Sequence, residues 1–306
     1  MYKKIFFLGT IVFYTSLFAR EAIVPIPLSM QVDAKKAALG KQLFFDTKLS
    51  RDETLNCANC HILEDGGDDN LPTSFGINGQ KGPINSPTVY NAVFNFRQFW
   101  DGRASDLQDQ AGGPLENPKE MGFTFKELIK RLQNTPYKEK FAALYPDGIT
   151  KKNITDAIAE YEKTLITPNA PFDKFLRGDN KAITQEQKEG YALFKSKGCI
   201  TCHHGINIGG NLYNKFGIYQ DANTTDFGRY NITHKQRDKY YFKVPSLRNI
   251  AQTAPYFHDA RTSDLKTAVY IMAQYQLGRK ITPQEIDKIV AFLQSLSGEL
   301  PKNIEY

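Results

Sequence analysis

The sequence predicts an all-α protein of two similar domains connected by long loops, and three observations indicate this fold class. Helix-capping patterns recur along the chain, whereas the alternating pattern of a strand is scarce. A short motif of two cysteines and a histidine occurs twice, and a similar segment precedes each copy. The length of 306 residues is typical of about two domains.

Capping boxes mark three helix starts, at Thr124 with Glu127, Thr184 with Gln187, and Thr282 with Glu285. Apolar periodicity predicts further helices over 33 to 44, 137 to 145, 151 to 166 and 264 to 277. Two stretches rich in Gly, Asn, Asp and Pro, 64 to 92 and 204 to 235, are predicted to be loops. Loops of this length in a compact protein usually surround a site or a ligand.

The repeated motif reads CANCH at 57 to 61 and CITCH at 199 to 203, and its two copies use all four cysteines. This pattern is the attachment signature of c-type haem, in which two thiols form thioethers and the adjacent imidazole binds the iron. Two disulfides, redox dithiols or a Cys₂His zinc site are the alternatives. The repetition favours two covalently bound haem c groups. Their ligands would be Cys57, Cys60 and His61, and Cys199, Cys202 and His203.

The segments before the two motifs are alike. GKQLF occupies 40 to 44 and GYALF occupies 190 to 194, each near the end of a predicted helix. This repetition indicates two cytochrome c-like haem domains built on one duplicated plan, with the haem filling much of each apolar centre.

The N-terminus predicts an export signal. Lys3 and Lys4 precede an apolar run from Ile5 to Phe18, which is short for a membrane span and ends at Ala19. An uncleaved anchor is the alternative. We therefore expect a periplasmic protein with a signal peptide at 1–19, an N-terminal haem domain at 20–166 and a C-terminal haem domain at 167–306. Without Lys3 and Lys4 the net charge falls from +6 to +4, with no basic block of the kind that binds nucleic acid.

Few residues are available as second axial ligands. Beyond the motif histidines the chain has His204, His234 and His258. We expect His204 to point away from its neighbour, His234 to be exposed, and His258 to bond a haem propionate or the backbone. Met272 lies in an apolar helix after the second motif and suits an axial thioether, although a core methionine is the commoner fate of such a residue. A His/Met pair would make that iron a high-potential electron store.

The sequence resembles the bacterial di-haem cytochrome c peroxidases over nearly all of the expected mature chain. The resemblance is carried by both motifs, by TSFGINGQKGPINSPTVYNAVFNFRQFWDGRASDLQDQAGGPLENPKEMG, by FKVPSLRNIAQTAPYFHD and by AVYIMAQYQLG. It implies that the N-terminal haem is the low-potential site where hydrogen peroxide reacts. The C-terminal haem would receive electrons from a small cytochrome c or a copper protein. The family is commonly dimeric.

The resemblance also assigns roles to single residues. Met272 matches the axial methionine of the C-terminal haem, and Trp100 matches a tryptophan between the haems. Gln110 and Glu120 match the glutamine and glutamate above the peroxidatic haem. An amide can donate a hydrogen bond to peroxide without carrying charge, and a buried carboxylate can move a proton between its two oxygens. Without the resemblance, Trp100 would be read as core and Glu120 as a surface carboxylate.

A calcium site between the domains is a further implication of the resemblance. The matching positions are Asn85, Thr253 and Pro255, which offer a side-chain oxygen and backbone carbonyls. Spacing alone does not indicate this site.

One position departs from the family pattern. Most members have a histidine near the TSxG segment that caps the peroxidatic iron in the resting enzyme, and Ile77 stands there in this chain. No histidine occurs between 61 and 203. We expect an open N-terminal site that binds peroxide without prior reductive activation, unless Met121 or a loop lysine fills the position.

Three other functions remain possible at this point. A di-haem electron carrier would have both irons fully ligated by protein. A related di-haem enzyme class oxidises a partner protein and has a tyrosine as axial ligand, for which Tyr270 and Tyr275 lie near Met272. A disulfide-linked binding protein would contain no haem.

Overall fold

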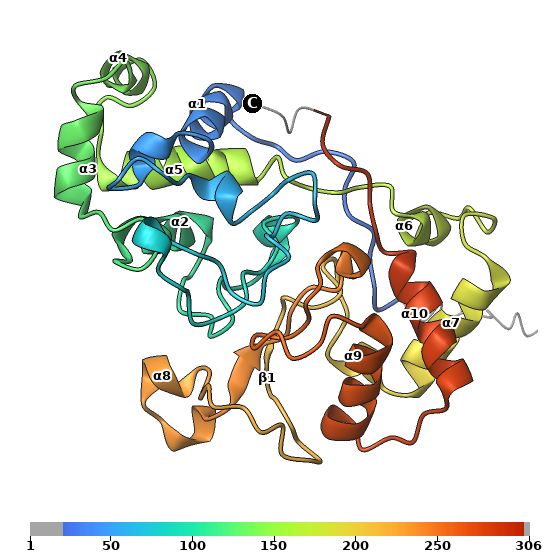
Figure 1. Ribbon diagram of the computed structural model, residues 1–306. Coiled ribbons are helices and arrows are strands. Elements are labelled where there is room, and N and C mark those ends of the chain that lie inside the picture. Colours follow the sequence, from blue (N-terminus) through green and yellow to red (C-terminus); the bar gives the residue numbers. More distant parts are fainter. Residues whose placement is uncertain (1–20, 303–306) are drawn as a thin grey trace, which may run out of the picture.

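The structure is a computed structural model in which residues 21–302 are described, so the predicted signal peptide lies outside the described residues. Helices dominate, and Figure 1 shows them in two groups. The first group is α1 (Ala34–Phe44), α2 (Leu107–Glu116), α3 (Phe125–Leu132), α4 (Tyr137–Ala142) and α5 (Lys151–Glu162). The second is α6 (Pro171–Leu176), α7 (Gln185–Ser196), α8 (Tyr230–Thr233), α9 (Leu265–Ile271), the π-helix η8 (Met272–Gln276) and α10 (Pro283–Gln294). The predicted all-α, two-domain cytochrome c-like fold is confirmed.

Short elements occupy the long connections. Two strands, β1 (Tyr213–Lys215) and β2 (Tyr241–Lys243), form an antiparallel pair in which Tyr213 faces Lys243. The 3₁₀ helices are Thr47–Leu49, Cys57–Asn59, Ile77–Gly79, Ala92–Phe94, Cys199–Thr201, Gln236–Asp238 and Ile250–Gln252. The stretches 64 to 92 and 204 to 235 are otherwise irregular, as predicted.

One glycine in each half allows two helices to pack very closely. α1 packs on α5, and α7 packs on α10. A Cβ atom at Gly40 would lie 1.8 Å from the carbonyl oxygen of Ala157, and one at Gly190 would lie 1.9 Å from that of Lys288. These glycines begin the GKQLF and GYALF segments, so the repeated sequence encodes the same helix crossing twice.

Each half has its own apolar core. In the first half Leu43, Leu128, Phe141 and Ile154 are fully buried around α1, α3, α4 and α5. In the second half the ring of Phe292 packs against those of Phe172 and Phe194, with centroids 4.9 and 5.1 Å away, a spacing at which aromatic edges and faces attract. These cores hold the motif-bearing loops against the helices.

The ends of the described chain cross between the halves. Ile23, near the start, is buried in the second core beside Phe172. Leu300, near the end, packs on the first half against the cluster that contains Phe44 and Tyr90. Figure 1 shows the corresponding blue and red segments passing between the two helix groups. The domain limits 20–166 and 167–306 therefore stay a prediction, although the helices divide near them.

Most predicted helix starts agree with the structure. The three capping boxes are formed, and Asp33 caps α1. α4 and α5 end earlier than predicted, at Ala142 and Glu162. The helix predicted over 264 to 277 becomes a π-helix from Met272 onward, and α2 was missed. No helix within residues 21–302 is both long and apolar enough to cross a membrane.

Candidate functional site

The first motif is a tight 3₁₀ turn that turns its histidine inward. The backbone N–H groups of Cys60 and His61 both donate to the carbonyl of Cys57, at 3.2 and 3.0 Å. The His61 Nδ1 lies 3.1 Å from the carbonyl oxygen of Gly67. Because a carbonyl only accepts, Nδ1 carries the proton and Nε2 keeps its lone pair. Burial lowers the pKa of His61, which favours this neutral, metal-binding form.

The second motif repeats this geometry. The His203 N–H donates to the Cys199 carbonyl at 3.0 Å, and His203 Nδ1 lies 3.2 Å from the carbonyl oxygen of Ile208. Burial lowers the pKa of His203 to about 4. Both imidazoles are therefore neutral at physiological pH, with Nδ1 anchored and Nε2 available for a metal.

All four cysteines are free thiols in the described residues. Burial raises the pKa of Cys60 and Cys199 to about 11, so these groups are protonated at neutral pH. No cluster of three or more His, Cys, Asp or Glu side chains suited to a metal occurs between residues 21 and 302. No disulfide joins the sulfur atoms of either motif, which does not support the disulfide-linked alternative.

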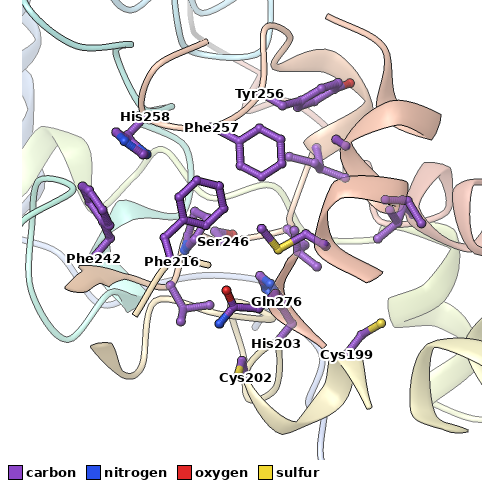
Figure 2. Close-up of a pocket in the computed structure, with 18 of the residues that line it drawn as sticks. Cys199, Cys202, His203, Phe216, Phe242, Ser246, Tyr256, Phe257, His258 and Gln276 are labelled. Atoms are coloured by element: carbon purple, nitrogen blue, oxygen red, sulfur yellow. The ribbon is translucent and has the colours of Figure 1, made fainter. Parts of the chain in front are cut away.

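Each motif lies on the wall of its own cavity. The N-terminal cavity is lined by Cys57, Cys60 and His61 together with residues from 74 to 121 and from α5. The C-terminal cavity is lined by Cys199, Cys202 and His203 and by largely apolar side chains. Figure 2 shows the two cysteines below His203, with Tyr256, Phe257 and His258 at the opposite side. Each cavity thus has a histidine with a free Nε2 atom, two cysteine thiols and largely apolar walls. This combination fits a covalently bound haem in each cavity.

Glu120 lies on the wall of the N-terminal cavity, in the turn after α2. Its carboxylate accepts a hydrogen bond from Asn117 Nδ2 at 2.6 Å, and its backbone carbonyl accepts from the N–H of Ile77 at 2.8 Å. Burial raises the pKa of the carboxyl group, while the Asn117 bond and Arg103 act in the opposite direction. Glu120 is thus a partly desolvated carboxylate inside a cavity and not a surface residue.

Gln110 lines the same cavity from α2, a helix that the sequence analysis missed. Asp106 caps this helix by accepting from the N–H of Asp109, and Ser105 and Asp106 were the available signal. Pro114 and two glycines lower the helix propensity of the segment, which explains the omission. Arg103 also lines the cavity and was not singled out from the sequence.

Trp100 lines both cavities. Its indole Nε1 donates to the carbonyl of Asn85 at 2.9 Å, and its own carbonyl accepts from the N–H of Lys243 at 2.7 Å. The indole is therefore anchored to the N-terminal half, and the backbone of Trp100 is bonded to the C-terminal half. The role of Trp100 between the two sites stays a prediction.

Met272 lies on the wall of the C-terminal cavity together with His203. It begins the π-helix, a rare conformation that is frequent at functional sites. Tyr270 is 47% exposed, and neither it nor Tyr275 is among the lining residues. The structure thus places the methionine, and not a nearby tyrosine, at the cavity.

The remaining three histidines have other surroundings. His204 Nδ1 contacts the Asn211 side chain at 3.0 Å, and His234 is exposed. His258 is buried on the C-terminal cavity wall, stacked on Phe242 with centroids 4.1 Å apart. Its Nε2 lies 2.9 Å from Thr224 Oγ1. A bond from His258 to a haem propionate or to the backbone stays a prediction.

Ile77 is buried but is not among the residues that line the N-terminal cavity. Its Cδ1 atom would lie 2.4 Å from a Cβ at Gly122, so the side chain packs against that turn. Met121 does line the cavity and is also part of the first core.

The predicted calcium positions Asn85, Thr253 and Pro255 line one cavity wall. Asn85 Nδ2 donates to the Leu71 carbonyl at 2.9 Å, which leaves its amide oxygen for another partner. Nearby on the wall, the 2% exposed Asp68 has one carboxylate oxygen without a hydrogen-bond partner in the described residues. Burial and the neighbouring Asp69 raise the pKa of Asp68 to about 7. The calcium site at Asn85, Thr253 and Pro255 stays a prediction.

The fold and the two motif-bearing cavities define a two-domain, c-type di-haem protein. Residues 34–181 match the family described as di-haem cytochrome c peroxidase, and residues 187–297 match the cytochrome c family. The chain belongs to the di-haem cytochrome c peroxidases and is a peroxidase-type oxidoreductase with two c-type haems.

Similar proteins support this assignment. The chain is 52% identical to cytochrome c peroxidase Ccp of Escherichia coli K12 over 91% of its own length, but this match spans only 61% of the E. coli protein. It is 46% identical to cytochrome c551 peroxidase of Nitrosomonas europaea, over 92% of this chain and 86% of that one. The methylamine utilization protein MauG of Methylophilus methylotrophus is 32% identical, over 92% and 88%.

Solved structures share the fold. A MauG-like protein associated with microbial copper homeostasis has a TM-score of 0.78 at 25% identity, with 94% of this chain and 96% of that chain covered. The di-haem peroxidase BthA of Burkholderia thailandensis has a TM-score of 0.73 at 20% identity, with 89% of each chain covered.

Proposed function

We propose that this chain is a periplasmic peroxidase that reduces hydrogen peroxide to water with electrons from a small c-type cytochrome or a copper protein. The observation that carries the proposal is the placement of Trp100 on both cavity walls, with Glu120 and Gln110 facing the N-terminal cavity alone. Export by a cleaved signal peptide at 1–19 and a possible homodimer are part of the proposal. The names of the similar peroxidases support the substrate and a cytochrome donor.

The N-terminal cavity would be the site of peroxide reduction. Haem iron, when bound by His61, supplies the Lewis-acidic and redox chemistry there. Glu120 would take a proton from one oxygen of peroxide and return it to the departing oxygen, which is what a partly buried carboxylate within reach can do. Gln110 would orient peroxide by donating from its amide. Arg103, beside Glu120, would keep part of the carboxyl population ionised.

The C-terminal cavity would be the electron entry. His203 and Met272 line it and would hold the haem iron there through Nε2 and the thioether sulfur, a pair that would supply a raised reduction potential. Trp100 would pass electrons to the N-terminal site. Reduction of peroxide to two waters consumes two electrons and two protons, so one electron from each haem completes the reaction without an organic substrate.

The upper side of the N-terminal haem is proposed to lack a protein ligand in the resting state. Ile77 cannot bind iron and packs on Gly122 outside the cavity lining, and no histidine occurs between 61 and 203. Peroxide would then react with the fully oxidised protein. Met121 and Lys119 both line that wall and are the side chains that would compete as ligands. Met121→Leu and Lys119→Met variants separate their contributions.

A calcium ion at Asn85, Thr253 and Pro255 is part of the proposal. The unpartnered oxygen of buried Asp68 on the same wall supports it, because a cation would offset an otherwise uncompensated negative charge. Removal of calcium with a chelator, followed by a calorimetric titration, should show one binding event per chain.

The test of the function uses the haem-loaded protein from a host that matures c-type cytochromes. We expect two haems per chain and two electrons taken from a reduced donor cytochrome for each peroxide consumed. A chain that exchanges electrons without consuming peroxide would be an electron carrier. Replacement of Met272 by Leu should abolish the low-spin signal of one haem, and an unchanged signal would favour the partner-oxidising class.

A further inference from the structure

Lys243 is a buried cation on the wall of the C-terminal cavity. It is the last residue of β2, where its N–H donates to the carbonyl of Trp100 at 2.7 Å. The residue is only 6% exposed. Lys243 is paired with Tyr213 of β1. The backbone of Lys243 is therefore fixed both by the strand pair and by the bond to Trp100.

The ammonium group of Lys243 has no ion pair and no hydrogen bond within residues 21–302, and no charged neighbour contributes to its pKa. Burial alone lowers that pKa to about 8, so the group remains mostly protonated at neutral pH. Arg248, the other deeply buried cation, shows the usual arrangement: its guanidinium contacts the Asp173 carboxylate at 2.6 Å and two backbone carbonyls.

Burying an unpaired ammonium costs free energy, because the group loses its hydrogen bonds to water. An anion or several hydrogen-bond acceptors must replace those bonds. The protein supplies none here. The occupant expected in this cavity is a c-type haem, which carries two propionate carboxylates as its charged groups. Two other lysines line this cavity, but Lys197 pairs with Glu285 at 2.7 Å and Lys215 is exposed to solvent. Lys243 is therefore the buried and unpaired cation that such an anion would find.

We propose that the Lys243 ammonium pairs with a propionate carboxylate of the C-terminal haem. The inference rests on the proposed assignment of this cavity to the electron-entry haem. In a low-dielectric cavity, a positive charge close to the haem stabilises the electron-rich, reduced state. Lys243 would thereby raise the reduction potential of the haem that is proposed to be the electron store.

The chain offers a matched control in Lys215. This lysine ends β1, lines the same cavity and is exposed to solvent, so its charge is screened by water. Lys243→Met and Lys215→Met remove the same charge from adjacent strands, whereas Lys243→Arg keeps the charge at the buried position.

The test is a spectroelectrochemical titration of the haem-loaded variants. At the midpoint potential of the wild-type C-terminal haem, we expect Lys243→Met to lower the ratio of reduced to oxidised haem at least tenfold, which is a shift of about 59 mV for one electron. Lys243→Arg and Lys215→Met should stay within about twofold of wild type, or roughly 18 mV by the same relation. The N-terminal haem should shift less than the C-terminal haem in Lys243→Met.

Two results would overturn the pairing: an unchanged potential in Lys243→Met, or an equal fall in Lys215→Met. Met272→Leu separates this failure from a failure of the proposed function, because loss of the thioether lowers the same potential whether or not Lys243 is paired. If Lys243→Met does not load haem, Lys243→Gln measured beside Lys243→Arg gives the same comparison, since glutamine keeps polarity and removes only the charge.

Discussion

The indole Nε1 of Trp100 donates to the backbone carbonyl of Asn85 at 2.9 Å, and both residues line both cavities. Asn85 is in turn fixed by its N–H, which donates to the carbonyl of His258 at 3.0 Å. The first bond fixes the indole to a loop of the N-terminal half. The second fixes that loop to His258, on the wall of the C-terminal cavity. This arrangement places the only tryptophan of the chain on the walls of both cavities, which is the position that the proposed electron relay requires.

Replacement of Trp100 by Phe should slow peroxide turnover. The ring remains but the Nε1 bond to Asn85 is lost, so the aromatic group is no longer fixed between the cavities. We expect at least a tenfold fall in the turnover rate, about 1.4 kcal/mol in activation free energy, and a loss of about 0.5–1.5 kcal/mol of stability. Phe96→Leu, which changes a 39% exposed ring that lines neither cavity, is the control. Full turnover in Trp100→Phe would rule out the relay.

Replacement of Glu120 by Gln should lower the value of kcat/KM for peroxide by about 10²–10⁴-fold, the range for loss of a general acid–base group. Glutamine keeps the shape and can still contact Asn117, but it cannot accept a proton. The haem spectrum should be unchanged. The matched control is Glu116→Gln, an exposed carboxylate at the end of α2 that pairs with Lys151. A comparable loss in the control would show that general electrostatics, and not proton transfer, is responsible.

The pH profile of the peroxidase should depend on Asn117. Burial raises the pKa of Glu120, and the hydrogen bond from Asn117 to the carboxylate opposes that rise by stabilising the charged form. A base must be unprotonated, so activity falls as pH drops through this pKa. In Asn117→Ala the opposing bond is gone, and the acid limb should move to higher pH. A limb that stays in place or moves to lower pH would contradict the role of Glu120 as the base.

Replacement of either close-packing glycine by Ala should destabilise the protein. A new Cβ would lie 1.8 Å from the Ala157 carbonyl oxygen at Gly40, and 1.9 Å from that of Lys288 at Gly190. We expect each to cost at least about 1–3 kcal/mol in the free energy of unfolding, measured by denaturant titration. Gly112→Ala in α2 is the control, because the nearest atoms to its new Cβ would be 3.7 Å away, at ordinary van der Waals distance. Equal stability in all three variants would contradict the shared helix crossing.

Local sequence signals predicted the helices that have strong caps. Thr124, Thr184 and Thr282 form the expected capping boxes because the interaction involves only the first turn of each helix. The start of the π-helix at Met272 was not predictable, because the helical periodicity continues through it and the change depends on packing in the C-terminal half. α2 was missed for a related reason: Gly112, Gly113 and Pro114 weaken its local preference.

The site residues that belong to a local sequence motif could be predicted from the sequence. The residues that reach the site only through folding were harder to predict. The two cysteine–histidine motifs were evident from spacing alone. That Glu120 and Gln110 line one cavity depends on the turn that brings 119 and 120 against Gly76, a contact between segments far apart in sequence. The unpaired ammonium of Lys243 had no sequence signal, because burial without a partner is visible only in three dimensions.

The most direct test of the account is rapid mixing of the fully oxidised, haem-loaded protein with hydrogen peroxide, followed in the haem absorption bands. With Ile77 packed away from the N-terminal cavity and no histidine between 61 and 203, we expect an immediate spectral change without prior reduction, and the same change in Met121→Leu. A spectrum that stays unchanged until one haem has been reduced would contradict the open site and would require a protein ligand on the N-terminal haem.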